Sequence, residues 1–176
     1  MKITPTQIQG VHVIDVTRHE DDRGFFARSW DADELTRHGL DTALHLSAIT
    51  HNKIKGTLRG MHFQAAPMAE TKFVRVTRGS IFDVALDLRK ESPTYLRWHG
   101  EILSERNHRQ LYIPKGCAHG YLTLEDDTEL TYFLSAAYSL EHARGVRYND
   151  QAFGIIWPGE IRLIAPRDAA YADYVP

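Results

Sequence analysis

Alternation of apolar and polar residues is the main pattern along the chain, and it predicts short strands. In Ser80–Arg89 every second residue is apolar, a period of two that is typical of a half-buried strand. Lys72–Thr77 alternates in the same way and is joined to that segment by Arg78-Gly79, so the two segments predict a β-hairpin. One face of the longer segment carries Phe82, Val84, Leu86 and Leu88, and the other carries Ile81, Asp83, Ala85 and Asp87.

Helical patterns are scarce. Asp31–His38 reads as a helix because acidic residues occupy its first turn and Gly39 follows its end. A weaker helical turn is predicted near Pro166-Arg167-Asp168. Many short strands between Gly and Pro turns predict one all-β domain over residues 1–176, a sandwich or barrel. Further strands are predicted at Val11–Val16, Gly24–Ser29, Ala43–Ile49, Leu58–Gln64, Leu96–Leu103, Arg109–Ile113, Tyr121–Leu124, Glu129–Leu134, Gly154–Trp157 and Ile161–Ile164.

Composition limits the kinds of molecule that the protein is expected to bind. The formal net charge is −2, which argues against a broad electrostatic grip on nucleic acid or on anionic lipid. No apolar run approaches the roughly 20 residues that span a bilayer, and the N-terminal segment lacks the apolar core of a signal peptide. The only cysteine, Cys117, excludes an internal disulfide and a multi-cysteine metal site. We therefore expect a cytoplasmic protein that acts on a small molecule.

Two segments, Gly56–Gln64 and Pro114–Tyr121, place a histidine among small and apolar residues, where glycine allows close approach to the backbone. Either histidine taken by itself is as readily an ordinary core residue. If these strands line one interior, however, Arg59 and Lys72 cannot both be buried there without an anionic partner. A bound phosphate or a developing oxyanion is the simplest such partner.

The spacing resembles the cupin pattern, in which a glycine leads to a first histidine and a P-x-G-x-x-H motif carries a second. These histidines are His62 and His119 here. Metal-binding cupins continue the first motif as His-x-His with a glutamate nearby, but Gln64 takes the second histidine position and Glu70 is displaced. Because a catalytic metal normally needs three such ligands, a metal site is not favoured.

Further motifs extend this pattern along nearly the whole chain. In order they are Arg23-Gly24-Phe25-Phe26, Leu58–Gln64, Lys72, Asp83–Arg89, Ser92–Tyr95, Ile113–Tyr121, Tyr132, Tyr138, Tyr148–Asp150, Ile156–Pro158 and Arg167-Asp168. The ordered set resembles the dTDP-4-dehydrorhamnose 3,5-epimerases, nucleotide-sugar epimerases with a cupin-type jelly roll. The resemblance implies an all-β jelly roll, no metal or redox cofactor, and a homodimer in which a segment such as Ile8–Val16 adds to the partner's sheet.

The family inverts carbons 3 and 5 of a 4-keto-6-deoxyhexose on a nucleoside diphosphate, through an enolate. The resemblance implies that His62 is the base, paired with Asp168, and that Tyr132 is the proton donor. Lys72 matches the cation that stabilises the enolate oxygen. Without the resemblance, Asp168 would read as the cap of the last helical turn, Tyr132 as an inward strand tyrosine and Lys72 as a solvated strand end.

Substrate contacts are also implied by the resemblance, with departures. At six positions this chain differs from the family: Arg28 and Ala143 replace glutamates, Glu70 replaces a glutamine, and Ser47-Ala48-Ile49 replaces a Gln-Asp-Asn stretch. These departures leave open which nucleobase is bound and whether one or both carbons are inverted. The predicted substrate-binding residues are Arg23, Arg59, His119, Tyr138, Gln64, Arg28, Ser47 and Ile49.

Two other functions remain as alternatives: a metal-dependent cupin oxygenase or isomerase, and a non-catalytic cupin that only binds a sugar nucleotide. Metal analysis and activity after chelation separate the first from the epimerase. The joint presence of His62, Tyr132 and Lys72 with Asp168 disfavours the second, since binding needs no acid and base on opposite faces of a ligand.

Overall fold

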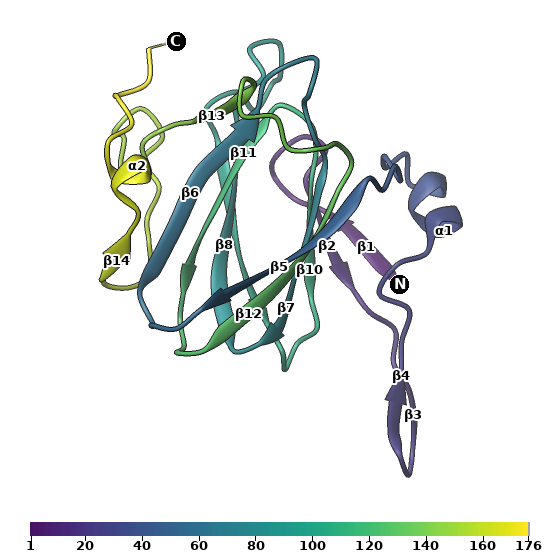
Figure 1. Cartoon of the computed structure of the whole chain (residues 1–176). Helices are drawn as coiled ribbons and strands as arrows, with labels where there is room; N and C mark the ends of the chain where they lie inside the picture. The colour runs from purple at the N-terminus through teal and green to yellow at the C-terminus, as the bar shows by residue number, and fades with distance from the viewer. Residues whose placement is uncertain (176) are drawn as a thin grey trace.

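Two β-sheets pack face to face in the computed structural model, which describes residues 1–175 (Figure 1). The first sheet has the order β1 (Lys2–Pro5), β2 (His12–Asp15), β10 (Gln110–Ile113), β7 (Lys72–Arg78), β12 (Thr128–Leu134), β5 (Leu46–Asn52). The second has the order β13 (Ala143–Gly145), β6 (Thr57–Gln64), β11 (Cys117–Thr123), β8 (Ser80–Asp87), β9 (Trp98–Ser104), with β14 (Leu163–Ile164) parallel to β6. The all-β jelly-roll prediction is confirmed.

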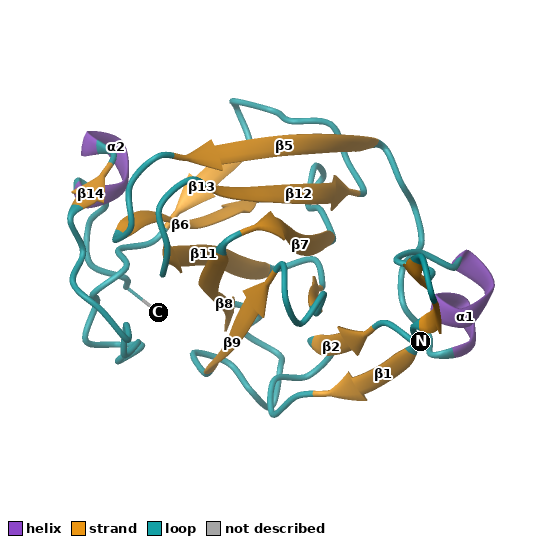
Figure 2. Cartoon of the chain, turned by 90° about the horizontal axis from the view of Figure 1, so that it is seen from below, coloured by secondary structure: helices purple, strands orange, loops and turns teal. Residues whose placement is uncertain are grey.

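Three smaller elements lie outside the two sheets. The strands β3 (His19–Asp21) and β4 (Gly24–Phe26) form a hairpin that projects from the body. Helix α1 (Ala32–Arg37) lies on one side of the molecule and α2 (Pro166–Ala169) on the other (Figure 2). No helix within residues 1–175 is long and apolar enough to cross a membrane.

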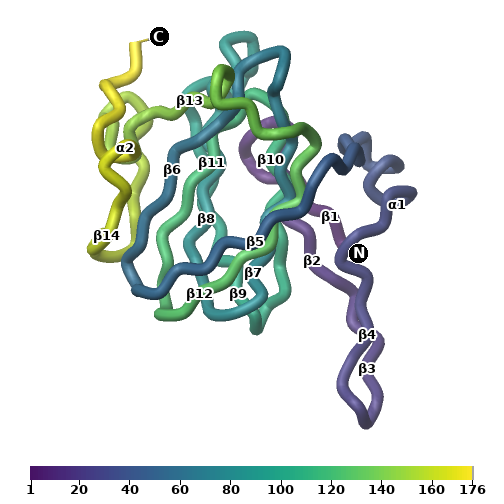
Figure 3. Tube along the Cα trace, viewed as in Figure 1, coloured from purple at the N-terminus to yellow at the C-terminus, as the bar shows by residue number. Residues whose placement is uncertain are grey.

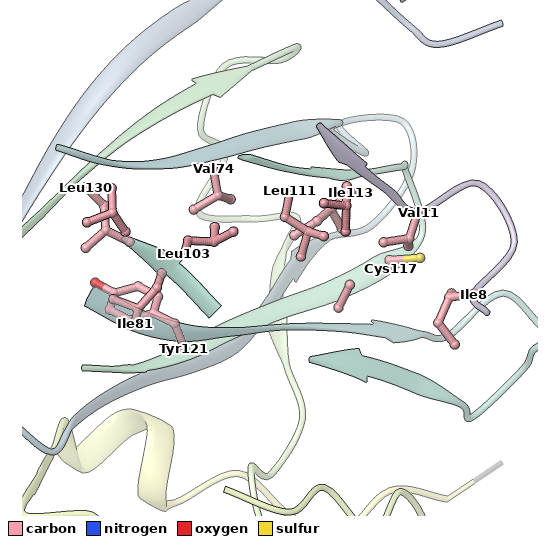
Figure 4. Close-up of a cluster of buried hydrophobic side chains, with 13 residues drawn as sticks. Ile8, Val11, Val74, Ile81, Leu103, Leu111, Ile113, Cys117, Tyr121 and Leu130 are labelled. Atoms are coloured by element: carbon pink, nitrogen blue, oxygen red, sulfur yellow. The ribbon is translucent and has the colours of Figure 1, made fainter. Parts of the chain in front are cut away.

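The main core lies between the sheets (Figure 4). Alternation explains it, because Val74 and Val76 of β7 point inward while Arg75 between them does not join this core. Strand β8 exists as predicted, but it is not half-buried: Ile81 faces the main core and Val84 packs in a second cluster on the opposite face. That second cluster forms because the chain after β12 folds back over the outer face of the second sheet, contributing Val146, Phe153, Ile155 and Trp157.

The predicted hairpin between residues 72–77 and 80–89 is wrong. Gly79, at φ +74°, makes a tight turn, but β7 and β8 then enter different sheets. Strand β7 pairs with β10 and β12, while β8 pairs with β11 and β9, so each has both edges occupied. Alternation indicates a strand but does not indicate which neighbour it pairs with.

The N-terminal expectation also needs correction. Strand β2, within the segment Ile8–Val16, lies between β1 and β10 of its own sheet, so neither of its edges is free for a partner. The predicted helix is confirmed, and Asp31 caps it by accepting a hydrogen bond from the Glu34 backbone N–H at 3.1 Å. Gly154–Trp157 is not a strand, and β5 begins three residues later than predicted. Strands β1, β3 and β13 lacked a clear pattern and were not predicted.

Asp87, at the end of β8, organises the turn that follows. Its carboxylate accepts hydrogen bonds from the Arg89 side chain at 2.8 Å, from Ser92 at 2.5 Å and from Thr94 at 2.7 Å. Burial opposes ionisation, but these bonds and the Arg89 backbone N–H outweigh it and lower the pKa of Asp87 from 3.8 to about 2.

We expect Asp87→Asn to lower the free energy of unfolding at pH 7 by about 2 kcal/mol. Because the folded pKa lies below the unfolded one, this stabilisation is present above pH 3.8 and is lost as the pH falls towards about 2. Urea unfolding at pH 7 and pH 3 measures both effects. Glu91→Gln, a change at an exposed residue nearby, is the control. Equal destabilisation by Asp87→Asn at the two pH values would contradict the assignment.

Candidate active site

The two motif histidines are direct neighbours across paired strands. His62 of β6 stands opposite His119 of β11, and the ladder shifts register just beyond this pair. Gly60 and Gly120 allow the strands to approach: a Cβ on Gly60 would lie 2.5 Å from the Gly120 Cα, and one on Gly120 would lie 2.6 Å from the Met61 Sδ. The glycines therefore admit a neighbouring strand rather than a ligand, and they bring the histidines together.

His62 forms a dyad with Asp168, which α2 carries to the edge of β6 (Figure 3). The distance from Nε2 of His62 to Oδ1 of Asp168 is 2.7 Å, and Oδ2 accepts from the Gly60 backbone N–H at 3.1 Å. Burial favours neutral Asp168, but the hydrogen bonds from His62 and Gly60 outweigh it and lower the pKa of this carboxyl. With Nε2–H donating to a carboxylate, Nδ1 is the basic nitrogen of His62.

The N-cap reading of Asp168 is wrong. The residue at the cap of α2 is Ala165, which makes no side-chain cap, and Asp168 lies inside the helix with its side chain 5% exposed. The His62 ring is 42% exposed and lines a cavity between the sheets. The Asp168 end of the dyad is therefore buried, and the His62 end is accessible from the cavity.

Tyr132 faces His62 from the opposite sheet. Both side chains line one cavity of about 280 Å³, here called the first cavity, and Tyr132 comes from β12 whereas His62 comes from β6. The Tyr132 ring also stands edge-on to His119, with 5.9 Å between centroids. Burial, and then the neighbouring Tyr121 phenol, raise the pKa of Tyr132 well above 10, so its hydroxyl keeps its proton. Other residues that line the first cavity are Ala48, Thr50, Arg59, Lys72, His119, Tyr121 and Leu134.

Cationic side chains lie in the first cavity as predicted, and each has an oxygen partner. The Arg59 Nε donates to Oδ1 of Asn52 at 2.8 Å. The Lys72 Nζ lies 3.2 Å from a Glu70 oxygen and donates to the His62 carbonyl at 3.3 Å. The solvated-strand-end reading of Lys72 is therefore wrong.

Asp83 is a site residue that the sequence analysis missed. It is fully buried, and its Oδ1 lies 2.7 Å from Nε2 of His119, which makes a second histidine–carboxylate pair beside the first. The only signal in the sequence was that Asp83 shares its face of the strand with the apolar residues Ile81 and Ala85. Arg144 and Arg167 were also not predicted as lining residues.

A second cavity of about 300 Å³ shares His62 and Lys72 with the first. Tyr138, one of the predicted substrate-binding residues, lies at its margin and is 63% exposed. Arg167, whose Nε donates to the Tyr171 hydroxyl at 3.1 Å, lines it as well. The remaining lining residues are Phe63, Gln64, Glu70, Ala143 and Arg144.

Four predicted substrate-binding residues are not brought to these cavities by this chain. Arg23 is paired with Asp21 in the projecting hairpin, and Arg28 is paired with Asp31. Ser47 and Ile49 point away from the first cavity, because the alternating residues Ala48 and Thr50 line it.

The side chains at this site do not provide a full set of ligands for a metal ion. Within residues 1–175, no group of three or more His, Cys, Asp or Glu side chains is placed to hold a metal ion. Glu70, the displaced third ligand considered from the sequence, contacts Lys72 and Gln64 instead. His62 and His119 each face a carboxylate at 2.7 Å.

Comparison with known proteins agrees with this geometry. The sequence profile described as dTDP-4-dehydrorhamnose 3,5-epimerase matches residues 5–174. The chain is 42% identical over 151 residues to the Sinorhizobium fredii enzyme of that name, covering 86% of this chain and 77% of the relative. The crystal structure of the Bacillus anthracis enzyme with TDP and PPi bound is similar, with 38% identity, a TM-score of 0.94, and coverage of 98% of this chain and 99% of that one.

A second solved structure extends the likeness to a sugar complex. The Legionella pneumophila dTDP-6-deoxy-D-glucose-3,5-epimerase, in complex with dTDP-4-keto-L-rhamnose, is 37% identical with a TM-score of 0.90. The match covers 97% of this chain and 90% of that chain. Since the family profile spans nearly all of the residues and these relatives match over most of their length, this chain is an enzyme of the dTDP-4-dehydrorhamnose 3,5-epimerase family.

Proposed function

We propose that this enzyme inverts C3, C5 or both in a nucleoside-diphosphate 4-keto-6-deoxyhexose, in deoxysugar biosynthesis. The observation that carries the proposal is that His62 and Tyr132 line one cavity from opposite sheets, and that Lys72, on β7 next to β12, lines the same cavity. Both carbons are α to the C4 ketone, so a base on one face and an acid on the other suffice to invert them. The relatives described above support a sugar nucleotide as the substrate.

The proton transfers follow from the placement of the groups. Nδ1 of His62 removes an α-proton, the C–H electrons form the enolate, and Asp168 stabilises the imidazolium. The ammonium of Lys72 stabilises the charge that develops on the C4 oxygen. The Tyr132 hydroxyl then protonates the carbon from the opposite face and regains its proton from solvent, while the His62 imidazolium releases its proton to solvent. No metal or redox cofactor takes part, because both transfers use side chains.

Binding of the nucleotide uses the edges of the same cavities. The planar guanidinium of Arg59 suits a diphosphate oxygen. Exposed Tyr138 suits a stacked nucleobase. A cytoplasmic location also belongs to the proposal, and the single buried cysteine supports it; cell fractionation tests it.

A time course of proton NMR in D₂O tests the reaction. The substrate is dTDP-4-keto-6-deoxyglucose, with the CDP, GDP and UDP analogues in parallel and a chelator in half of the samples. Loss of both the C3 and C5 signals establishes a 3,5-epimerase, and loss of one establishes a mono-epimerase. No exchange with any substrate in folded protein would favour a binding protein, and exchange that the chelator abolishes would favour a metal-dependent enzyme.

A homodimer is also proposed, in which the β3–β4 hairpin packs on the partner. Two-stranded hairpins are marginally stable by themselves, yet this one projects with Phe26 66% exposed and Arg23 89% exposed at the side chain. The outer face of β5 likewise leaves Ile49 70% exposed. A partner that covers both surfaces would bury these residues, which lie outside the cavities of their own chain.

We expect Phe26→Asp to weaken the dimer at least 10-fold, or about 1.4 kcal/mol, because it places a charge in an apolar contact. Analytical ultracentrifugation over a concentration series measures the change. Ile102→Asp, on an exposed residue of β9, is the matched control and should leave association unchanged. A wild-type protein that sediments as a monomer throughout would refute the dimer.

A further inference from the structure

Glu70 is a buried carboxylate that the proposed chemistry does not use. It follows β6 and lines the second cavity, where its side chain and that of Lys72 are each 9% exposed. One carboxylate oxygen lies 3.2 Å from the Lys72 Nζ, and the other accepts from the Gln64 Nε2 at 2.8 Å. The carboxylate is thus held between a cation and an amide.

Gln64 is itself held on both sides of its amide. Its oxygen accepts from the Ser139 backbone N–H at 2.6 Å, and its nitrogen also donates to the Met68 and Ala137 carbonyls at 3.0 Å. The predicted role of Gln64 as a substrate contact therefore does not fit, because protein atoms occupy both ends of the amide. Through Gln64 the Glu70 carboxylate is therefore connected to Ala137 and Ser139, the two residues that flank Tyr138.

The position of Lys72 depends on this support. A lysine side chain has a flexible four-carbon stem and loses rotamer freedom when it is fixed. The Lys72 side chain is also only 9% exposed, and burial of an unpaired ammonium is unfavourable. The Glu70 carboxylate offsets both effects and holds Nζ where both cavities meet.

We propose that Glu70 is the positioning residue of Lys72: together with Gln64 it orients the ammonium towards the C4 oxygen of the bound sugar. This inference rests on the proposed function. The competing explanation is that Glu70 only neutralises a buried charge and contributes to stability. The two differ in whether the effect of Glu70 on turnover requires Lys72.

A double-mutant cycle separates them. Glu70→Ala, which removes the carboxylate that contacts Lys72 and Gln64, should lower kcat about 10-fold while KM changes less than about 2-fold, because a misplaced group weakens mainly the transition state. Added to Lys72→Met, the same change should cost nothing further. Glu91→Gln is the matched surface control. Full kcat in Glu70→Ala, or an equal loss with and without Lys72, would overturn the proposal.

A second measurement does not depend on turnover. Trinitrobenzenesulfonate labelling, mapped to Lys72 by mass spectrometry, should be several-fold faster in Glu70→Ala, because the contact with the Glu70 carboxylate holds the nitrogen in place. Other lysines should label at unchanged rates. If the wild type exchanges no substrate proton, the proposed function fails, but labelling still judges the role of Glu70. Unchanged labelling of Lys72 would overturn it.

Discussion

Replacing His62 with alanine will slow loss of the substrate's α-protons to solvent by a factor of about 10²–10⁴ or more, the usual loss for a general base. The reason is that Asp168 bonds to Nε2 of His62, which leaves Nδ1 as the basic nitrogen. The imidazole ring lines the first cavity, where the substrate is proposed to bind. Exchange at C3 and C5 will fall together, since one base serves both positions. Proton NMR in D₂O measures the rate at each carbon.

The control for this experiment is His38→Ala, at the exposed end of α1. It should retain wild-type exchange. Circular dichroism and binding of the nucleoside diphosphate will show that the His62 variant is folded. Exchange within a few-fold of the wild-type rate in His62→Ala would remove His62 from the role of base.

Tyr132→Phe will abolish most of the epimerised product and leave residual solvent exchange at C3. The phenyl ring fills the same space, but it has no proton to return from the sheet opposite His62. We expect a loss of product formation of about 10²-fold or more, the scale of a lost general acid. Comparing deuterium incorporation with product stereochemistry separates proton removal from reprotonation.

Tyr148→Phe, a change outside both cavities, is the matched control. It should turn over normally. Normal epimerisation by Tyr132→Phe would place the acid elsewhere, and Tyr121, the other phenol in the first cavity, would then be tested. Loss of exchange and product to the same extent would instead show that Tyr132 is needed before the enolate forms.

Much of the local structure follows from short patterns. The period of two marks β8, and the acidic residues of the first turn mark α1, which Asp31 caps in the structure. These patterns work because strand and helix periods involve neighbouring residues. The same reasoning failed at Gly79, where a hairpin was predicted, because which strands pair depends on contacts between distant parts of the chain.

The site shows the same division. His62, Tyr132 and Asp168 were identified through an ordered set of motifs, while Asp83 looked like a solvent-facing residue of an alternating strand. In the structure, however, Asp83 lies on the face of β8 that packs in the main core with Ile81 and Ala85, and the returning chain covers the opposite face. Gln64 was likewise predicted as a substrate contact, and only the structure shows that its amide forms hydrogen bonds with backbone atoms of Met68, Ala137 and Ser139.

The sequence by itself determined that this is an all-β protein and which family it belongs to, and it predicted which residues carry the acid–base chemistry. The tertiary structure decided that Asp168, 106 residues away, reaches His62. It also decided that Tyr132 opposes them from the other sheet and that Arg23 lies outside the cavities of its own chain. The physical reason is range: periodicity and motif spacing act over a few residues, whereas a site between two sheets is made by strand pairing and burial across the whole chain.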